Sequence, residues 1–160
     1  MQAQYHFDYL RYENKSSLPV KDAELLEAAL SATQHAYAPY SSFKVGAAAR
    51  LANGIIITGS NQENASYPVG ICAERVLLGN AAVQYPGLAI ESMAITYRTE
   101  KRASDSPVSP CGMWRQALVE FESRVNSSIR LILGGEQGEV IVTDSALQLL
   151  PFAFGNQHLH

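Results

Sequence analysis

Two cysteines and one glutamate have the types and spacing that metal-assisted chemistry requires. Cys72 opens the run "CAERVLLGNAAVQ", Glu74 follows two residues later, and Cys111 opens a second run, "CGMWRQALVEFE". If each run is a helix, each sulfur lies at a helix N-terminus, where free N–H groups and the helix dipole lower a thiol pKa. Two such thiolates could share one cation, and Glu74 could move a proton of a water beside it.

Each of these residues also has a plain structural interpretation. A free cysteine is often a small buried residue, and an acidic residue is common in the first turn of a helix. Taken singly, these interpretations are the stronger ones. The sequence around the three residues decides whether they act together.

The runs that would position these residues alternate between strands and helices. "FKVGAAARLA" and "IIITGSNQEN" flank Asn53-Gly54, which is the strongest hairpin signal in the chain. Hydrophobic spacing predicts helices over residues 20–37, 72–84 and 111–122, and further strands over 88–97, 128–135 and 139–145. This alternation predicts a layered α/β sandwich whose sheet opens with an antiparallel hairpin.

The N-terminal segment has a pattern of its own. In "QYHFDYLRYE" the aromatic residues Tyr5, Phe7 and Tyr9 alternate with polar ones. This pattern is typical of a strand. We expect either an edge strand or a clasp onto a neighbouring subunit.

Composition limits the partners of the chain. Its 160 residues are 47% hydrophobic and 17% charged, as expected for one folded domain. A net charge of -3 offers no basic surface for long nucleic acid, although one small nucleoside remains compatible. We find no apolar run of the roughly 18 residues that span a membrane, and no signal peptide. The two cysteines are therefore expected to be reduced thiols in a cytoplasmic protein.

The sequence words around the cysteines resemble those of the homotetrameric cytidine deaminases, a family of zinc-dependent nucleoside deaminases. The match runs from about Leu25 to Phe154 and keeps the family's order and spacing, in the words "AYAPYSSFKVGAA", "GSNQENASYP", "CAERVLLGNA", "PCGMWRQALVEF" and "LLPFAF". The resemblance implies a three-layer α/β/α sandwich with a mixed five-stranded sheet. It further implies a homotetramer and a single domain over residues 1–160, with residues 1–19 as an N-terminal strand or extension.

The resemblance also implies a reaction and a metal. The protein would be a hydrolase of pyrimidine salvage that converts cytidine or deoxycytidine to uridine or deoxyuridine. Water activated by Zn²⁺ would attack C4, and Glu74 would carry a proton to N3 and to the leaving ammonia. Cys72 and Cys111 match two of the three metal-binding cysteines. Arg75 matches a residue that hydrogen-bonds the thiolates and offsets their charge.

Further residues match the substrate-binding positions of the family. Asn61 and Glu63 match the pair that holds the ribose hydroxyls. Their types suit a neutral sugar, because an amide and a carboxylate on one face of a strand can together donate and accept hydrogen bonds. Phe43 matches an aromatic residue beside the base, although core packing would also explain it. The resemblance adds the backbone near Ala73 and Cys111, and pocket-lining segments, partly from a neighbouring subunit, at Tyr67 and Phe154.

The chain departs from the family at the third metal ligand. The family pattern Pro-Cys-x-x-Cys reads "PCGMW" here, which places Trp114 at the position of the second cysteine. Indole has no free lone pair, so Trp114 cannot replace a thiolate, and the Met113 thioether is a weak zinc ligand. We expect Trp114 to crowd the substrate or to swing away. Loss of one ligand in three should weaken zinc binding by a few kcal/mol, a fraction of the roughly 10–16 kcal/mol measured for complete structural sites.

Three interpretations of Trp114 remain open. The chain is a working deaminase that carries a change at this one codon, a nucleoside-binding homologue without catalysis, or an active protein that recruits another ligand. A deaminase of a cytosine-containing antibiotic shares the same scaffold and is a further alternative. Glu74 would be useless without activated water, so its presence favours a deaminase with a recent loss.

Overall fold

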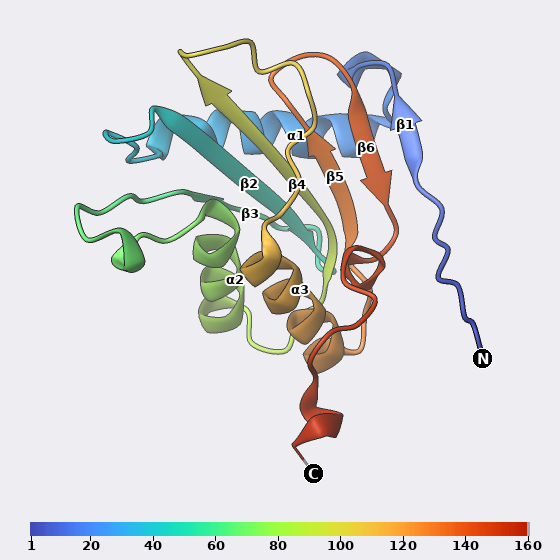
Figure 1. The fold of residues 1–160 in the computed structure, drawn as a ribbon. Coiled ribbons are helices and arrows are strands. Elements are labelled where there is room, and N and C mark those ends of the chain that lie inside the picture. Colours follow the sequence, from blue (N-terminus) through green and yellow to red (C-terminus); the bar gives the residue numbers. More distant parts are fainter. Residues whose placement is uncertain (160) are drawn as a thin grey trace.

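The computed structural model describes residues 1–159, and it has a six-stranded sheet between two layers of helices (Figure 1). The spatial order of the strands is β1-β6-β5-β4-β2-β3. The strands are β1 (Leu10–Tyr12), β2 (Phe43–Leu51), β3 (Ile56–Ser60), β4 (Ile90–Thr99), β5 (Arg130–Gly134) and β6 (Val140–Thr143). Strands β4 and β5 are parallel, whereas the other neighbouring pairs are antiparallel. The predicted α/β fold with a mixed sheet is confirmed.

The sheet has one strand more than the five expected, because the N-terminal segment pairs with its edge. Leu10–Tyr12 lies antiparallel to residues 140–142 of β6, and the side chain of Arg11 donates to Glu139 at 3.1 Å. This pairing satisfies backbone groups of β6 that would otherwise stay open. The edge strand is shorter than its aromatic pattern predicted, since residues 1–9 lie outside it.

Three long helices cover the sheet, one on one face and two on the other (Figure 1). Helix α1 (Val20–Ala32) packs Leu25, Leu26 and Ala29 onto one face of the sheet. Helices α2 (Ala73–Gln84) and α3 (Gly112–Val125) pack onto the opposite face. Short 3-10 turns complete the chain, at Lys15–Ser17, Thr33–His35, Tyr67–Val69, Ala146–Leu149 and Asn156–His158. No helix within residues 1–159 is both long and apolar enough to cross a membrane.

Gly59 on β3 allows α2 to begin directly against the sheet. A Cβ atom at Gly59 would lie 2.3 Å from the Ala73 carbonyl oxygen and 2.7 Å from the Leu77 amide nitrogen, both backbone atoms of α2. Only a residue without a side chain permits this approach. The contact holds the first turn of α2, and so Cys72 and Glu74, close to the strand.

Substitution of Gly59 by alanine should therefore destabilise the protein. We expect the free energy of unfolding to fall by about 1–3 kcal/mol, because backbone atoms have to move to admit the methyl group. The matched control is Gly79→Ala on α2, where an added Cβ meets nothing within 4 Å. That substitution should raise the free energy of unfolding by up to about 1 kcal/mol through helix propensity. Urea unfolding measures both, and equal effects would contradict the close approach.

Candidate active site

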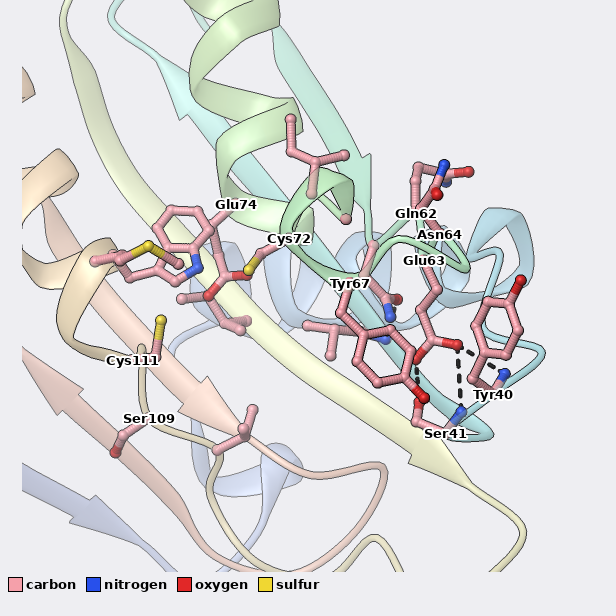
Figure 2. Close-up of a pocket in the computed structure, with 18 residues that line it drawn as sticks. Tyr40, Ser41, Gln62, Glu63, Asn64, Tyr67, Cys72, Glu74, Ser109 and Cys111 are labelled. Atoms are coloured by element: carbon pink, nitrogen blue, oxygen red, sulfur yellow. Dashed lines mark hydrogen bonds between the residues drawn. The ribbon is translucent and has the colours of Figure 1, made fainter.

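The N-termini of α2 and α3 bring the two cysteines to one cavity. Cys72 is the N-cap residue of α2 and Cys111 is the N-cap residue of α3, and neither side chain is used to cap its helix. Both residues line a cavity of about 590 Å³. Such a volume suits a small organic ligand. Figure 2 shows the two sulfurs on the same side of this cavity, next to Glu74.

Burial, rather than the helix N-terminus, dominates the acidity of Cys72. Desolvation raises the pKa of the Cys72 thiol above its usual value, and the charges of Glu74 and Cys111 raise it further. A hydrogen bond from Trp114 and the charge of Arg75 oppose this rise. The expected lowering of this pKa is therefore wrong for Cys72 in the metal-free protein. The helix dipole acts within about one turn, but even the partial burial of Cys72 outweighs it.

Glu74 is a buried carboxyl group within this cavity. It lies in the first turn of α2 and is 5% exposed. Burial raises the pKa of Glu74 from 4.5 to about 7. The protonated and ionised forms therefore coexist near neutral pH, which is what a group that both gives and takes a proton needs.

Trp114 neither points into solvent nor leaves the site. Its side chain is 1% exposed, belongs to the hydrophobic core between the sheet and helices α2 and α3, and also lines the cavity. The expectation that it would swing away is not met. Trp114 also acts on Cys72, since its indole N–H opposes the rise in the pKa of that thiol. Trp114 is thus an ordered wall of the cavity.

Asn61 and Glu63 lie at the other end of the cavity, just after β3. The Asn61 amide joins them to the start of β2, since its Oδ1 accepts from the Val45 amide at 2.8 Å and its Nδ2 donates to the Phe43 carbonyl at 2.9 Å. Glu63 accepts from the backbone amides of Tyr40 and Ser41 at 2.9 and 3.2 Å. A hydrogen bond from the Ser41 hydroxyl is the largest cause that lowers the pKa of Glu63, and the two backbone hydrogen bonds lower it further. The carboxylate is therefore an anionic acceptor at neutral pH.

The remaining predicted residues divide into two groups. Tyr67 lines the cavity and is exposed, and its ring makes an edge contact with Tyr40 at 6.2 Å between centroids. Phe43 is not among the lining residues, because its ring stacks on Tyr97 at 4.8 Å. This stacking matches the core-packing interpretation of Phe43, and its role beside a base stays a prediction.

Three further predicted residues lie around the cavity without lining it. Ala73 is fully buried beneath it, as the first residue of α2. Arg75 is exposed, and its side chain takes part in no hydrogen bond among residues 1–159, so it influences Cys72 through charge alone. Phe154 is exposed on the far side of α3, where Gln116 donates to its carbonyl at 2.7 Å. Phe154 does not line the cavity within this chain, and its role there stays a prediction.

Residues without a predicted site role complete the lining, together with Met113, which the sequence suggested only as a weak metal ligand. Tyr40, Ser41, Gln62 and Asn64 surround Glu63 (Figure 2), and Met113 and Ser109 lie near Cys111. Of these, Ser41 had a recognisable signal. Its place in "YSSF" directly before a strand is typical of a serine that hydrogen-bonds nearby backbone amides.

Cys72 and Cys111 are the metal-ligand candidates of the cavity. Catalytic zinc is normally held by three protein ligands, with one position left for water. Within residues 1–159, no three histidine, cysteine or acidic side chains form a cluster suited to a metal. Cys72 and Cys111 supply two donors, and the third position holds the buried indole of Trp114. The residues present therefore do not fit a complete three-ligand zinc site.

Comparisons with known proteins identify the class to which this sheet, the paired helix N-termini and the buried carboxyl group belong, a zinc-dependent nucleoside-deaminase type of hydrolase. The family described as "Cytidine and deoxycytidylate deaminase zinc-binding region" matches residues 19–128. The cytidine deaminase of Sporosarcina psychrophila is 37% identical over 136 residues, which cover 85% of this chain and 93% of that protein. The cytidine deaminase of Halalkalibacterium halodurans is 37% identical over 130 residues, covering 81% and 91%.

Solved structures of cytidine deaminases are also similar to this chain. The crystal structure of cytidine deaminase from Burkholderia pseudomallei has a TM-score of 0.71 and 41% identity, and the match covers 82% of this chain and 97% of that one. The cytidine deaminase structure from Mycobacterium tuberculosis has a TM-score of 0.65 and 27% identity, over 86% and 99%. The chain belongs to the cytidine and deoxycytidylate deaminase family.

Proposed function

We propose that this chain is a cytidine and deoxycytidine deaminase of pyrimidine salvage, which releases ammonia from C4 and leaves uridine or deoxyuridine. One observation carries the proposal: the buried carboxyl group of Glu74 lies beside two cysteines from neighbouring helix ends, in a cavity that also holds Asn61 and Glu63. The likeness to cytidine deaminases over most of the chain supports it.

The cavity has two chemically different ends, which suit a base and a sugar. Figure 2 shows Cys72, Cys111 and Glu74 together at one end, and Glu63, Ser41 and Tyr40 at the other. A pyrimidine ring would lie at the first end, where Glu74 can hold a proton for N3 and then for the leaving amino group. The sugar hydroxyls would lie at the second end, where Glu63 accepts and Asn61 donates.

Cys72 and Cys111 are the residues that would bind the family's zinc ion, and the Arg75 charge would offset that of their thiolates. With two thiolates alone, we propose that zinc is bound weakly. The rate of deamination in this chain would then be limited by metal occupancy. The remaining cavity residues would still bind the nucleoside.

A second candidate function is nucleoside binding without turnover. The observation that favours it is the burial of Trp114, which is 1% exposed and packed in the core instead of displaced from it. Because Trp114 is packed in place, it gives the cavity an ordered wall against which a nucleoside could bind. The two functions differ only in whether ammonia is released.

We further propose that the chain acts as a cytoplasmic homotetramer formed by one domain, with residues 1–19 as an extension. Tyr67 and Phe154 support self-association, because they are 76% and 58% exposed and are large apolar side chains. In a tetramer, Phe154 of one subunit could reach the cavity of another. Contact between subunits would bury both aromatic rings.

Thermal unfolding with added nucleosides tests the proposed function. Uridine and cytidine should raise the melting temperature, and a concentration of about 100 times Kd corresponds to about 2.7 kcal/mol of stabilisation. Adenosine serves as the control, because the proposed function predicts recognition of pyrimidine nucleosides. Ammonia release from cytidine would identify the deaminase, and stabilisation without ammonia would identify the binding protein. Failure of all pyrimidine nucleosides to stabilise the chain contradicts both.

A further inference from the structure

The turn before β2 is tied to Glu63 by three hydrogen bonds. The backbone amides of Tyr40 and Ser41 donate to Glu63 Oε2 at 2.9 and 3.2 Å, and the Ser41 hydroxyl donates to Oε1 (Figure 2). Ser41 and Glu63 both line the cavity. One carboxylate of the cavity is thus held by a turn that lies 22 residues earlier in the chain.

The Ser41 hydroxyl has two partners, and this fixes its direction. Its oxygen accepts from the amide of Phe43, the first residue of β2, at 3.0 Å. A serine hydroxyl has one hydrogen, and here that hydrogen is given to Glu63. The next residue, Ser42, has a left-handed backbone with φ of 57°. Few non-glycine residues adopt this conformation, so the turn is held in a specific shape by its contacts.

Few hydrogen-bonding positions at this end of the cavity remain free for a ligand. An ionised carboxylate has about four acceptor positions, and three of those on Glu63 are already used. The free position is on Oε1, the oxygen that Ser41 contacts. Asn61 already uses its Oδ1 and one hydrogen of Nδ2, which leaves one N–H for a ligand.

We propose that Ser41 is a positioning residue for the sugar of the nucleoside: its hydroxyl holds the Glu63 carboxylate so that the free acceptor position of Oε1 faces the cavity. This inference rests on the proposed function, because it takes a sugar hydroxyl as the group that Glu63 receives. The two backbone amides hold Oε2, and without Ser41 no bond would hold Oε1 against rotation of the carboxylate about the Cγ–Cδ bond. Ser41 removes this freedom. The same bond is the largest cause of the lowered pKa of Glu63, which keeps the acceptor ionised.

Calorimetric binding of two uracil nucleosides tests this inference without requiring turnover. Ser41→Ala should raise the Kd of uridine about tenfold, as expected when one hydrogen bond to a charged group is misplaced. The Kd of 2′,3′-dideoxyuridine, which lacks the 2′ and 3′ hydroxyls of the sugar, should change less than twofold. Ser41→Thr keeps the hydroxyl and should bind uridine within about threefold of the unchanged protein. The control is Ser66→Ala, a nearby exposed serine outside the cavity lining.

The outcomes separate the inference from the function on which it rests. Equal loss of both ligands in Ser41→Ala would mean that the turn is merely structural, and an unchanged uridine Kd would mean that Ser41 does not position Glu63. Either result overturns the inference while uridine binding by the unchanged protein upholds the proposed function. If the unchanged protein binds neither ligand, both fail. Should Ser41→Ala not fold, Ser41→Cys, a weaker donor of similar size, must show the same selective loss for uridine.

Discussion

Replacing Trp114 by cysteine should convert this chain into an efficient zinc-dependent cytidine deaminase. The substitution supplies the third thiolate beside Cys72 and Cys111, and three protein ligands complete a catalytic zinc site. We expect close to one zinc ion per chain, against clearly less in the unchanged protein. We also expect cytidine turnover to rise by at least about 100-fold, since metal catalysis contributes several kcal/mol and each 1.36 kcal/mol is a tenfold change in rate.

The same substitution should make stability depend on metal. Trp114 is fully buried in the core, so its removal leaves a cavity that costs about 3–5 kcal/mol when no metal is bound. Zinc bound to three ligands should more than offset this loss. A chelator should therefore lower the melting temperature of Trp114→Cys strongly and that of the unchanged protein only slightly.

Trp114→Ala is the matched control, because it makes a similar cavity without adding a ligand. It should be destabilised whether or not zinc is present, and it should gain no activity. Full zinc occupancy in the unchanged protein would point to a substitute ligand. If Trp114→Cys binds zinc but gains no turnover, nucleoside binding without catalysis becomes the better description of this chain.

Replacing Glu74 by glutamine should stabilise the protein without zinc at alkaline pH and strongly lower the turnover of the zinc-loaded enzyme. Burial raises the pKa of Glu74 to about 7 in the folded chain, from 4.5 when exposed. Between these two values the folded protein holds a proton that the unfolded chain has lost. The stability contributed by Glu74 therefore falls as pH rises from about 4.5 to 7 and stays low above that range.

Glutamine keeps the shape of the side chain but cannot ionise, so it avoids the loss of stability that Glu74 causes as pH rises. At pH 8, Glu74→Gln should raise the free energy of unfolding by up to about 3 kcal/mol, the equivalent of the pKa shift, and the gain should shrink toward zero near pH 4.5. Urea unfolding in the presence of a chelator, at several pH values, measures this. Glu91→Gln on the exposed side of β4 is the control, with an expected change below about 0.5 kcal/mol.

Activity gives the opposite result for the same substitution. In Trp114→Cys protein loaded with zinc, adding Glu74→Gln should lower turnover by about 10²–10⁴-fold, the usual contribution of a positioned acid/base group. Retained turnover would remove Glu74 from the proton transfers. A pH-independent effect on stability would show that its carboxyl group is not desolvated as the structure indicates.

Local patterns in the sequence were sufficient for the elements that carry the site. The hairpin predicted at Asn53-Gly54 is present, with β2 and β3 antiparallel and Gly54 at φ of 83°, a conformation that favours glycine. Helices begin directly after Cys72 and Cys111, as their hydrophobic spacing predicted. These features depend on interactions between residues that are close in the sequence, so they can be predicted from the sequence directly.

The ends of the elements were predicted less well. The first helix ends at Ala32 instead of residue 37, and the Thr33 hydroxyl bonds to the Leu30 carbonyl at 2.7 Å in the 3-10 turn that follows. The third helix continues to Val125, where Asn126 ends it in a left-handed conformation. The N-terminal alternation predicted an edge strand but not its partner, because β1 pairs with residues of β6 that lie about 130 positions away in the sequence.

The sequence alone determined which groups could do chemistry: Cys72, Glu74 and Cys111, with a tryptophan where a third thiolate belongs. Only the tertiary structure decided how each group behaves. It buries Glu74 and so raises its pKa, packs Trp114 into the core against Cys72, and connects Glu63 to Ser41. The reason is physical, because desolvation and hydrogen-bond partners depend on which distant segments fold around a residue, whereas residue type and helix position are local properties.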